Sequence, residues 1–466
     1  MLFNTFSFPI FLVIAFVVYR LLQTHRLPRL LWLLMVSAFF YGCWKPWYLI
    51  LVAISTLNSF AVGLGLARWQ QAHIRKALLV VGVTGDLLLL GIFKYGNFVT
   101  ESLEAGAAAI GIGLTLPHVP AELPVGISFY TFQTLSYTID VYRRRIDATR
   151  SLLDFSVFVI FFPQLVAGPI VRAREFLPQL LERPRLDQTA IGEGISLILI
   201  GLAKKMILAD TLSTTLVQPF FDDVWNRGAL DTVVTLWAAN FQVYCDFSGY
   251  SDVAIGAALL FGFALPKNFD RPFLSRTPME HWRRWHISLS FWLRDYLYFP
   301  LGGSRHGEWR TTYALLVTFL LGGLWHGAGW TFVFWGLYNG VLLVLWRKWG
   351  PSPAQSRWGR ALEVFATFNS ICFGLIFLHA SSFSEAWAVC VALSRVATGP
   401  TDLSLVGLSV LCFAALLHLS PTRWKTALQE GFAKSPSYAI GLTVLLSGGV
   451  LSLFAGMARP FFYFQF

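Results

Sequence analysis

Two histidines are the side chains of this sequence that best fit a chemical role. His326 lies in the apolar segment 321–330 (LGGLWHGAGW), in which four glycines allow backbones to approach closely. An ionisable residue inside a transmembrane segment is a functional candidate by default. A neutral imidazole, with an ordinary pKa of about 6.5, is able to take a proton from a hydroxyl group at neutral pH. A histidine hydrogen-bonded between two helices explains His326 about equally well.

The second histidine, His286, lies in a stretch rich in arginine and tryptophan. Thr277-Pro278-Met279-Glu280 is a capping box with proline at the first helical position, so a helix is expected to begin there. A helical wheel places one group of side chains on its polar side: Arg283, His286, Ser290 and Arg294. The opposite side holds Trp282, Trp285, Leu289, Trp292, Leu293 and Tyr296. We expect one amphipathic helix in the membrane interface. His286 then either takes part in the chemistry or is a cation that faces the lipid headgroups.

Two carboxylates, Asp246 and Asp252, lie in the segment YCDFSGYSD, residues 244–252. The apolar run 232–265 is too long for one straight helix, and Ser248 followed by glycine predicts a break there. Broken helices are tolerated at membrane depth only where protein or a water-filled cavity covers the freed backbone. The two carboxylates, with Ser248 and Tyr250, therefore either line a central cavity or cap the broken helix ends.

Signatures of soluble enzymes are missing from the sequence. We find no G-x-S-x-G elbow, no Walker A loop, no HExxH and no GxGxxG after a strand. The five cysteines form no CxxC pair, so neither a disulfide framework nor a metal site is expected. Lys204 and Lys205 lie near a predicted helix end and are expected to pair or to snorkel.

The elements that must position these residues are membrane-spanning helices. Hydrophobic residues make up 56% of the 466 residues and charged residues only 13%, which excludes a soluble protein. Apolar runs of about twenty residues recur from end to end, so we expect an all-α polytopic membrane protein. The expected spans are about 6–24, 30–44, 47–67, 77–95, 124–142, 191–209, 232–265, 311–327, 330–346, 362–380, 404–420 and 438–457.

The distribution of basic residues predicts the orientation of the chain. A net charge of +11 is explained by basic cytoplasmic loops, so no nucleic-acid partner is expected. Loops after odd-numbered spans are basic early in the chain, which places both termini outside the cytoplasm. Residues 152–169 are apolar but have basic loops at both ends, the second holding Arg172, Arg174, Arg183 and Arg185, and are expected to re-enter from the cytoplasmic side. The expected total is about twelve crossings.

Six segments of the chain together resemble one family, the membrane-bound O-acyltransferases, and within it the bacterial branch that O-acetylates exopolysaccharides such as alginate. The resemblance runs in matching order along the whole chain. Cys245, where an aromatic residue is commoner, and Asn339, where many relatives carry histidine, depart from the pattern and put fine substrate selectivity in doubt. The matching segments are 124–144 (PVGISFYTFQTLSYTIDVYRR), 162–172 (FPQLVAGPIVR), 241–256 (FQVYCDFSGYSDVAIG), 280–303 (EHWRRWHISLSFWLRDYLYFPLGG), 321–340 and 461–466 (FFYFQF).

The resemblance implies a single membrane-embedded domain over residues 1–466. It would consist of N-terminal helices (1–120), a core that carries the catalytic motifs (124–346) and C-terminal helices (360–466), arranged as a ring of about twelve tilted helices around a central funnel, with re-entrant and interfacial helices. His326 and His286 are the implied catalytic residues, with no metal. The candidates for lining the tunnel or contacting substrate are Trp325, Asp246, Ser248, Tyr250, Asp252, Arg283, Arg294 and Asn339.

The implied activity is O-acetyl transfer across the bacterial inner membrane, with acetyl-CoA as a cytoplasmic donor substrate and no bound cofactor. The acceptor would be an exopolysaccharide hydroxyl, of alginate or cellulose type, or a periplasmic acetyltransferase partner of the SGNH type that works with the exopolysaccharide synthesis and export machinery. Arg271, Arg276, Arg283 and Arg284 are candidates for holding the donor phosphates. The placement of basic residues on the cytoplasmic side explains the same charges without that role. D-alanyl transfer from a carrier protein, a small-solute transporter and a non-catalytic subunit stay open as alternatives.

Overall fold

The computed structural model describes residues 1, 3–120, 122–166, 168–182, 186–395, 403–454, 456, 459, 461 and 462. Its described residues form helices and connecting segments, and none of them lies in a β-strand. The chain folds into two compact units. The first holds Met1–Leu186 with Ala257–Pro266, and the second holds Asp187–Gly256 with Lys267–Phe466. The single domain over 1–466 stays a prediction.

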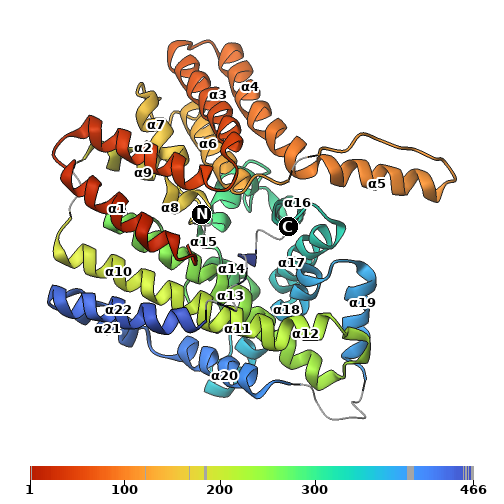
Figure 1. Ribbon diagram of the computed structural model, residues 1–466. Helices are drawn as coiled ribbons and strands as arrows, with labels where there is room; N and C mark the ends of the chain where they lie inside the picture. The colour runs from red at the N-terminus through yellow and green to blue at the C-terminus, as the bar shows by residue number, and fades with distance from the viewer. Residues whose placement is uncertain are drawn as a thin grey trace. The chain divides into compact units, whose positions relative to one another are not determined.

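The first unit is built around α3 (Leu49–Arg68), α4 (Ala72–Leu90) and α6 (Ile127–Tyr142), which pack on one another. Asp86 is buried between them and accepts hydrogen bonds from the hydroxyls of Ser55 and Ser59, both at 2.8 Å. A π-helical turn, Gly91–Tyr95, continues α4 into α5 (Gly96–Ala109), which extends from the end of α4 (Figure 1). The remaining helices are α1 (Ser7–Leu21), α2 (Arg26–Gly42), α7 (Leu152–Ile160), α8 (Phe162–Leu165) and α9 (Ala173–Leu181).

The second unit holds all the candidate site residues. A close pair, α16 (Gly307–His326) and α17 (Trp330–Trp349), lies beside α18 (Arg357–His379) (Figure 1). The long helix α13 (Ala229–Leu260) runs through this unit as far as Gly256. The other helices are α10 (Gln188–Ala203), α11 (Asp210–Leu212), α12 (Gln218–Phe221), α14 (Pro278–Arg284), α15 (Ile287–Leu293), α19 (Phe383–Ala392), α20 (Leu405–Leu419), α21 (Thr422–Ala433) and α22 (Ser437–Leu453).

Three of the described helical segments are long and apolar enough to cross a membrane: Pro46–Arg68, Ala72–Ala109 and Arg357–His379. A fourth span is formed if α20 and α21, bent by 89° at their junction, count as one. Every one of the twelve expected spans contains helix, but the number of crossings stays a prediction. Residues 152–165 form two short helices, and their re-entry into the membrane is likewise still a prediction. Arg183, Arg185 and residues 463–466 lie outside the described residues.

The break expected at Ser248 and Gly249 was wrong, because α13 is continuous through both residues. Gly249 serves close packing instead of ending a helix. A Cβ atom at Gly249 would lie 2.7 Å from the carbonyl oxygen of Gly201 on α10, so the two backbones meet where neither residue has a side chain. The carboxylates Asp246 and Asp252 therefore cap no broken helix end.

The single amphipathic helix expected over 278–296 was also wrong. The segment holds two short helices, α14 and α15, separated by Trp285 and His286, and continues as a π-helical turn. The start of the helix was correct, since the Thr277 hydroxyl accepts a hydrogen bond from the Glu280 N–H at 3.0 Å. His286 has a left-handed backbone, with φ +41° and ψ +56°, which changes the direction of the chain and shifts the phase of the helical wheel. The side chain therefore turns inward and is 1% exposed.

Candidate functional site

His326 is positioned by the packing of α16 against α17. It is the last residue of α16 and is 4% exposed. A Cβ atom at Gly323 would lie 2.8 Å from the Cα atom of Gly336, so the two helices approach backbone to backbone one turn before His326. This confirms close approach at Gly323, one of the four glycines noted in the segment. The contact brings the imidazole of His326 to 4.9 Å from the indole ring of Trp335 on α17, centroid to centroid.

His286 and His326 are brought together in this structure. Their ring centroids are 6.4 Å apart, with the planes inclined by 62°. Trp325 lies beside both, at 5.0 Å from the ring of His326 and 5.9 Å from that of His286. Phe247 on α13 covers His286 from another side, at 4.6 Å between centroids. The two imidazoles therefore share one aromatic enclosure.

The enclosure changes the electrostatics of His286. Among the described residues, neither of its ring nitrogens has a hydrogen-bond partner, although both are buried. Burial, and secondarily the charge that His326 would carry, lower the pKa of His286 well below its ordinary value, because desolvation disfavours the protonated ring. The neutral form that results presents one N–H donor and one lone pair. Buried polar groups are ordinarily hydrogen-bonded, so this ring is suited to contact a polar substrate group.

Asp246 belongs to a buried cluster of charged side chains near the histidines. Lys205 forms buried ion pairs with Asp246 at 2.8 Å and with Asp210 at 2.9 Å. The second carboxylate oxygen of Asp246 accepts a hydrogen bond from the Phe462 N–H at 2.7 Å. This ion-pair cluster fastens the C-terminal segment to α13 and confirms that Lys205 is paired.

Aromatic rings join this cluster to the histidines. Phe461 lies 5.5 Å from Phe247, which contacts His286, and 4.4 Å from Tyr250. Tyr250 is 1% exposed and follows Asp246 by one turn on the same face of α13. Tyr250 is therefore linked to His286 through Phe461 and Phe247, and Asp246 holds the neighbouring residue Phe462.

Four other candidates lie on α13, on α17 and at the end of α15. Asp252 pairs with Lys204 at 2.6 Å, on the face of α13 that also carries buried Ser248. Asn339 is buried on α17 and donates to the carbonyl oxygen of Trp335 at 2.8 Å. Arg294 is exposed and pairs with Asp295 at 2.7 Å. A role in lining a tunnel stays a prediction for these residues.

The arginines expected at the donor entrance have different partners. Arg271 donates to the carbonyl oxygens of His418 and Leu419 at the end of α20. Arg276 pairs with Glu363 at 2.6 Å and Arg284 with Glu280 at 2.6 Å. Arg283 is exposed, and its side chain has no hydrogen bond or ion pair with any residue that the structure describes. It is the guanidinium of the four that is most available to an anion.

Sequence reasoning missed Trp335 and Phe247 as parts of the site. Phe247 lies inside a motif whose polar residues attracted attention, and its position one residue after Asp246 places it on a separate helix face. Trp335 follows His326 within the next helix, and only the crossing of α16 and α17 brings it to the imidazole. The glycine in each helix, Gly323 and Gly336, was the signal in the sequence for that crossing.

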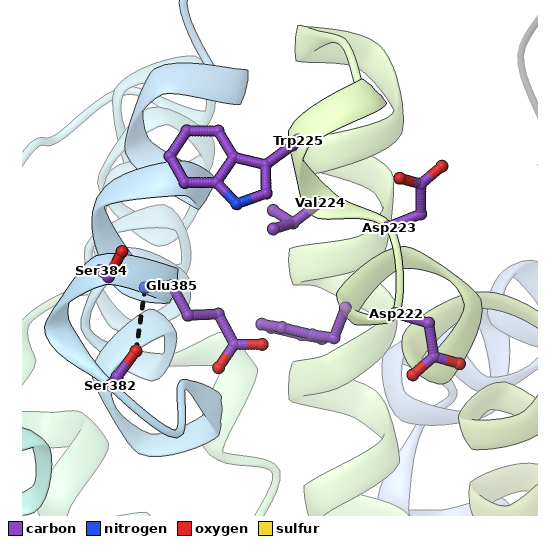
Figure 2. Close-up of a pocket in the computed structure, with 8 residues that line it drawn as sticks. Asp222, Asp223, Val224, Trp225, Ser382, Ser384 and Glu385 are labelled. Atoms are coloured by element: carbon purple, nitrogen blue, oxygen red, sulfur yellow. Dashed lines mark hydrogen bonds between the residues drawn. The ribbon is translucent and has the colours of Figure 1, made fainter.

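A separate hollow in the second unit contains none of the candidate residues. It is formed by α12, the segment 222–225 and the start of α19, with Trp225 facing Glu385 (Figure 2). Ser382 caps α19 by accepting a hydrogen bond from the Glu385 N–H at 3.2 Å (Figure 2), and Asp222 and Asp223 also line the hollow. The described residues that line it include no histidine.

Comparison with known proteins agrees with this arrangement. The sequence profile of the membrane-bound O-acyltransferase family matches residues 30–371, a range that includes both histidines and α13. The chain belongs to the membrane-bound O-acyltransferase family. It is therefore an all-α membrane protein and an O-acyltransferase, and the resemblance drawn from the six sequence segments is confirmed.

Individual relatives of this membrane-bound O-acyltransferase carry related names. The chain is 37% identical over 501 residues to the probable alginate O-acetylase AlgI of Pseudomonas putida, with 99% of each chain covered. It is 32% identical over 530 residues to the peptidoglycan O-acetyltransferase of Helicobacter pylori, covering 100% of this chain and 98% of the relative. Similarity to the teichoic acid D-alanyltransferase of Streptococcus thermophilus is weaker, 29% over 291 residues, covering 56% of this chain and 69% of that one.

Proposed function

We propose that this membrane-bound O-acyltransferase moves acetyl groups from acetyl-CoA in the cytoplasm to a hydroxyl group on the outer side of a bacterial inner membrane. The acceptor is an exopolysaccharide hydroxyl or a periplasmic acetyltransferase partner that completes the transfer. Relatives that match this chain along nearly its full length are named as O-acetylating proteins, whereas similarity to the D-alanyltransferase covers 56% of the chain. Acetyl is therefore favoured over D-alanyl as the transferred group.

The observation that carries the proposal is the buried pair of His286 and His326. Two imidazoles with centroids 6.4 Å apart, with Trp325, Trp335 and Phe247 around them, form a buried site. General-base catalysis contributes a factor of about 10²–10⁴, and the enclosure contributes by fixing the reactants in position. A transporter would not need two buried imidazoles in an aromatic enclosure.

His326 acts in this proposal as the general base. Its neutral imidazole takes the proton of the acceptor hydroxyl while the oxygen attacks the thioester carbonyl. The C–S bond then breaks, and the departing thiolate of coenzyme A takes the proton back from the imidazolium. His286, held neutral by burial, donates or accepts a hydrogen bond to the reacting groups. No metal enters these steps.

The donor is proposed to enter from the side of the chain that carries the basic loops. Arg283 is exposed near His286 in sequence and is the one of the four entrance arginines best able to bind a phosphate of coenzyme A. Arg271, Arg276 and Arg284 instead hold their own segments through carbonyl or carboxylate partners. In this proposal membrane lipids surround the helices, and the acceptor with its export machinery lies on the outer side of the membrane.

The proposed architecture is a ring of about twelve tilted helices around a funnel, with both termini outside. A helix in each of the twelve expected spans supports this count. The charge distribution supports the orientation, because the basic loops that follow odd-numbered spans belong on the cytoplasmic side. A cysteine introduced near Met1 should therefore react with an impermeant maleimide added outside intact cells.

Purified protein in liposomes, supplied with labelled acetyl-CoA, tests the proposed reaction. We expect slow hydrolysis or transfer of the acetyl group that depends on His326. His326→Ala should lower the rate by at least about 100-fold, with far-UV circular dichroism unchanged. Transfer retained in His326→Ala would contradict the proposal, and movement of solute without chemistry would point to a transporter.

A matched control uses His73, which is exposed in the first unit. His73→Ala removes an imidazole of the same chemistry and should leave the rate unchanged. Supplying a D-alanyl carrier protein in place of acetyl-CoA distinguishes the donor classes. Faster consumption of the D-alanyl thioester would overturn the choice of acetyl.

A further inference from the structure

His286 occupies an unusual position at the start of α15. It is the N-cap residue of that helix, where a side chain ordinarily accepts a hydrogen bond from one of the first backbone N–H groups. The His286 side chain makes no such bond. Its backbone is also left-handed, a conformation that a residue other than glycine keeps only when its surroundings enforce it. Another part of the chain must therefore supply both the cap and the constraint.

Asn268 supplies the missing cap. Its backbone carbonyl oxygen accepts a hydrogen bond from the Ile287 N–H at 2.9 Å. Its side-chain carbonyl oxygen accepts one from the Ser288 N–H at 3.3 Å and one from the Ser288 hydroxyl at 2.9 Å. Two of the unpaired donors that begin a helix are thus satisfied by one buried residue from outside that helix.

Asn268 is itself fixed to α13. Its side-chain amide donates to the hydroxyl of Ser251 at 3.1 Å. Ser251 follows Phe247 by one helical turn on the same face of α13, and Phe247 is the ring that covers His286. The residue that caps α15 and the ring that covers His286 are therefore both held by the same face of α13.

A second backbone contact closes the turn on its other side. The Asp270 N–H donates to the carbonyl oxygen of Arg284, the last residue of α14, at 2.8 Å. Residues 268–270 thus pair with the chain both before and after His286. The left-handed turn is held from both directions, as its strain requires.

We propose that Asn268 is the positioning residue of His286: it caps α15 in place of the His286 side chain and so leaves that imidazole directed toward His326. The proposal rests on the proposed function, because it assigns a role in acetyl transfer to the pair. Asn268 contacts no reacting group and acts only through the histidine. The side-chain amide of Asn268 makes the capping bond to Ser288. The His286 side chain is therefore not needed for the cap.

Hydrogen exchange tests the cap without reference to activity. In detergent, the Ser288 amide should exchange at least about tenfold faster in Asn268→Ala than in the wild type, because that substitution removes its acceptor. The Ile287 amide keeps the backbone carbonyl of residue 268 as its acceptor and should change less. Asn268→Asp keeps an acceptor oxygen and should exchange more slowly than Asn268→Ala. Unchanged exchange in Asn268→Ala would overturn the proposal.

Kinetics test the positioning role in the same proteins. Asn268→Ala should lower kcat for acetyl transfer by up to about 100-fold, the effect of a misplacement of about 1 Å, with KM for acetyl-CoA within about twofold of the wild type. Adding Asn268→Ala to His286→Ala should cause no further loss, because both changes disable one group. Faster exchange with an unchanged kcat would overturn the positioning role.

Asn97 provides the matched control. Its amide also makes two bonds to a loop, accepting from the Val119 N–H at 2.7 Å and donating to the Val119 carbonyl at 3.2 Å, but it lies in the first unit. Asn97→Ala should change neither exchange at 287–290 nor kcat. If the wild type transfers no acetyl group, the proposed function fails and the positioning role with it. Unchanged exchange in an active protein overturns the role of Asn268 alone.

Discussion

The imidazoles of His286 and His326 face one another at 6.4 Å between centroids, although one follows a left-handed turn between two short helices and the other ends a long helix. Trp325 contacts both rings, and each ring has a further aromatic neighbour of its own. This relationship links the fold to the chemistry of an O-acyltransferase.

Acid should destabilise the protein through His286. Because burial lowers its pKa in the folded protein, the unfolded chain binds a proton below about pH 6.5 that the folded chain does not bind. The free energy of unfolding should therefore fall with pH below that value, by up to about 1.4 kcal/mol per pH unit from this residue. Thermal unfolding between pH 7.5 and 5.0 should show a smaller loss of Tm in His286→Gln.

The exposed His73 is the control for this measurement. His73→Gln should reproduce the pH dependence of the wild type, since it removes an exposed imidazole that belongs to no part of the site. An equal loss of Tm in His286→Gln and wild type would show that His286 is not held neutral by the fold.

The glycine contact between α16 and α17 should be indispensable. Gly336→Val places methyl groups where a Cβ would lie 2.9 Å from the Cα atom of Gly323, so the helices must separate and move His326. We expect a loss of about 1–3 kcal/mol in stability and of at least about 100-fold in transfer. Gly441→Val, on α22 with open space around it, should behave like the wild type. Equal activity of the two variants would contradict this account of the site.

Arg283 should affect donor binding and little else. Arg283→Gln removes an exposed charge that holds no described residue, so Tm should stay within about 1 °C while KM for acetyl-CoA rises several-fold as a phosphate contact worth about 1 kcal/mol is lost. Arg305, which is also exposed, lies between α13 and α16 as Arg283 does. Arg305→Gln should leave KM unchanged. A fall in kcat at constant KM would assign Arg283 to the reaction step instead.

Removing Lys205 should expose the cost of burying charge. Lys205→Met leaves Asp210 and Asp246 buried without their cation, which should cost about 3–5 kcal/mol and weaken the hold of Asp246 on Phe462. Lys267→Met breaks an exposed pair with Asp270 and should cost at most about 1 kcal/mol. Neutralising both carboxylates in Lys205→Met should restore part of the stability. Equal costs at the two lysines would contradict a buried, structural cluster.

Much of the helical framework followed from the sequence, because apolar runs of membrane length have few alternatives to helix. Each expected span contains helix, the start at Pro278 was correct, and Lys205 is paired as predicted. The interpretation of Ser248 and Gly249 as a break failed because glycine has two uses, helix ending and close packing. Only the neighbouring Gly201 distinguishes them.

The sequence by itself determined that this protein is helical, embedded in a membrane and equipped with a histidine in an apolar segment, since composition and local pattern carry those properties. The tertiary structure decided which residues meet. His286 was expected on a polar face and lies buried beside His326, because one left-handed residue, held by hydrogen bonds from Asn268, reverses the direction of its side chain. Such a constraint comes from a distant segment, and no local pattern around His286 records it.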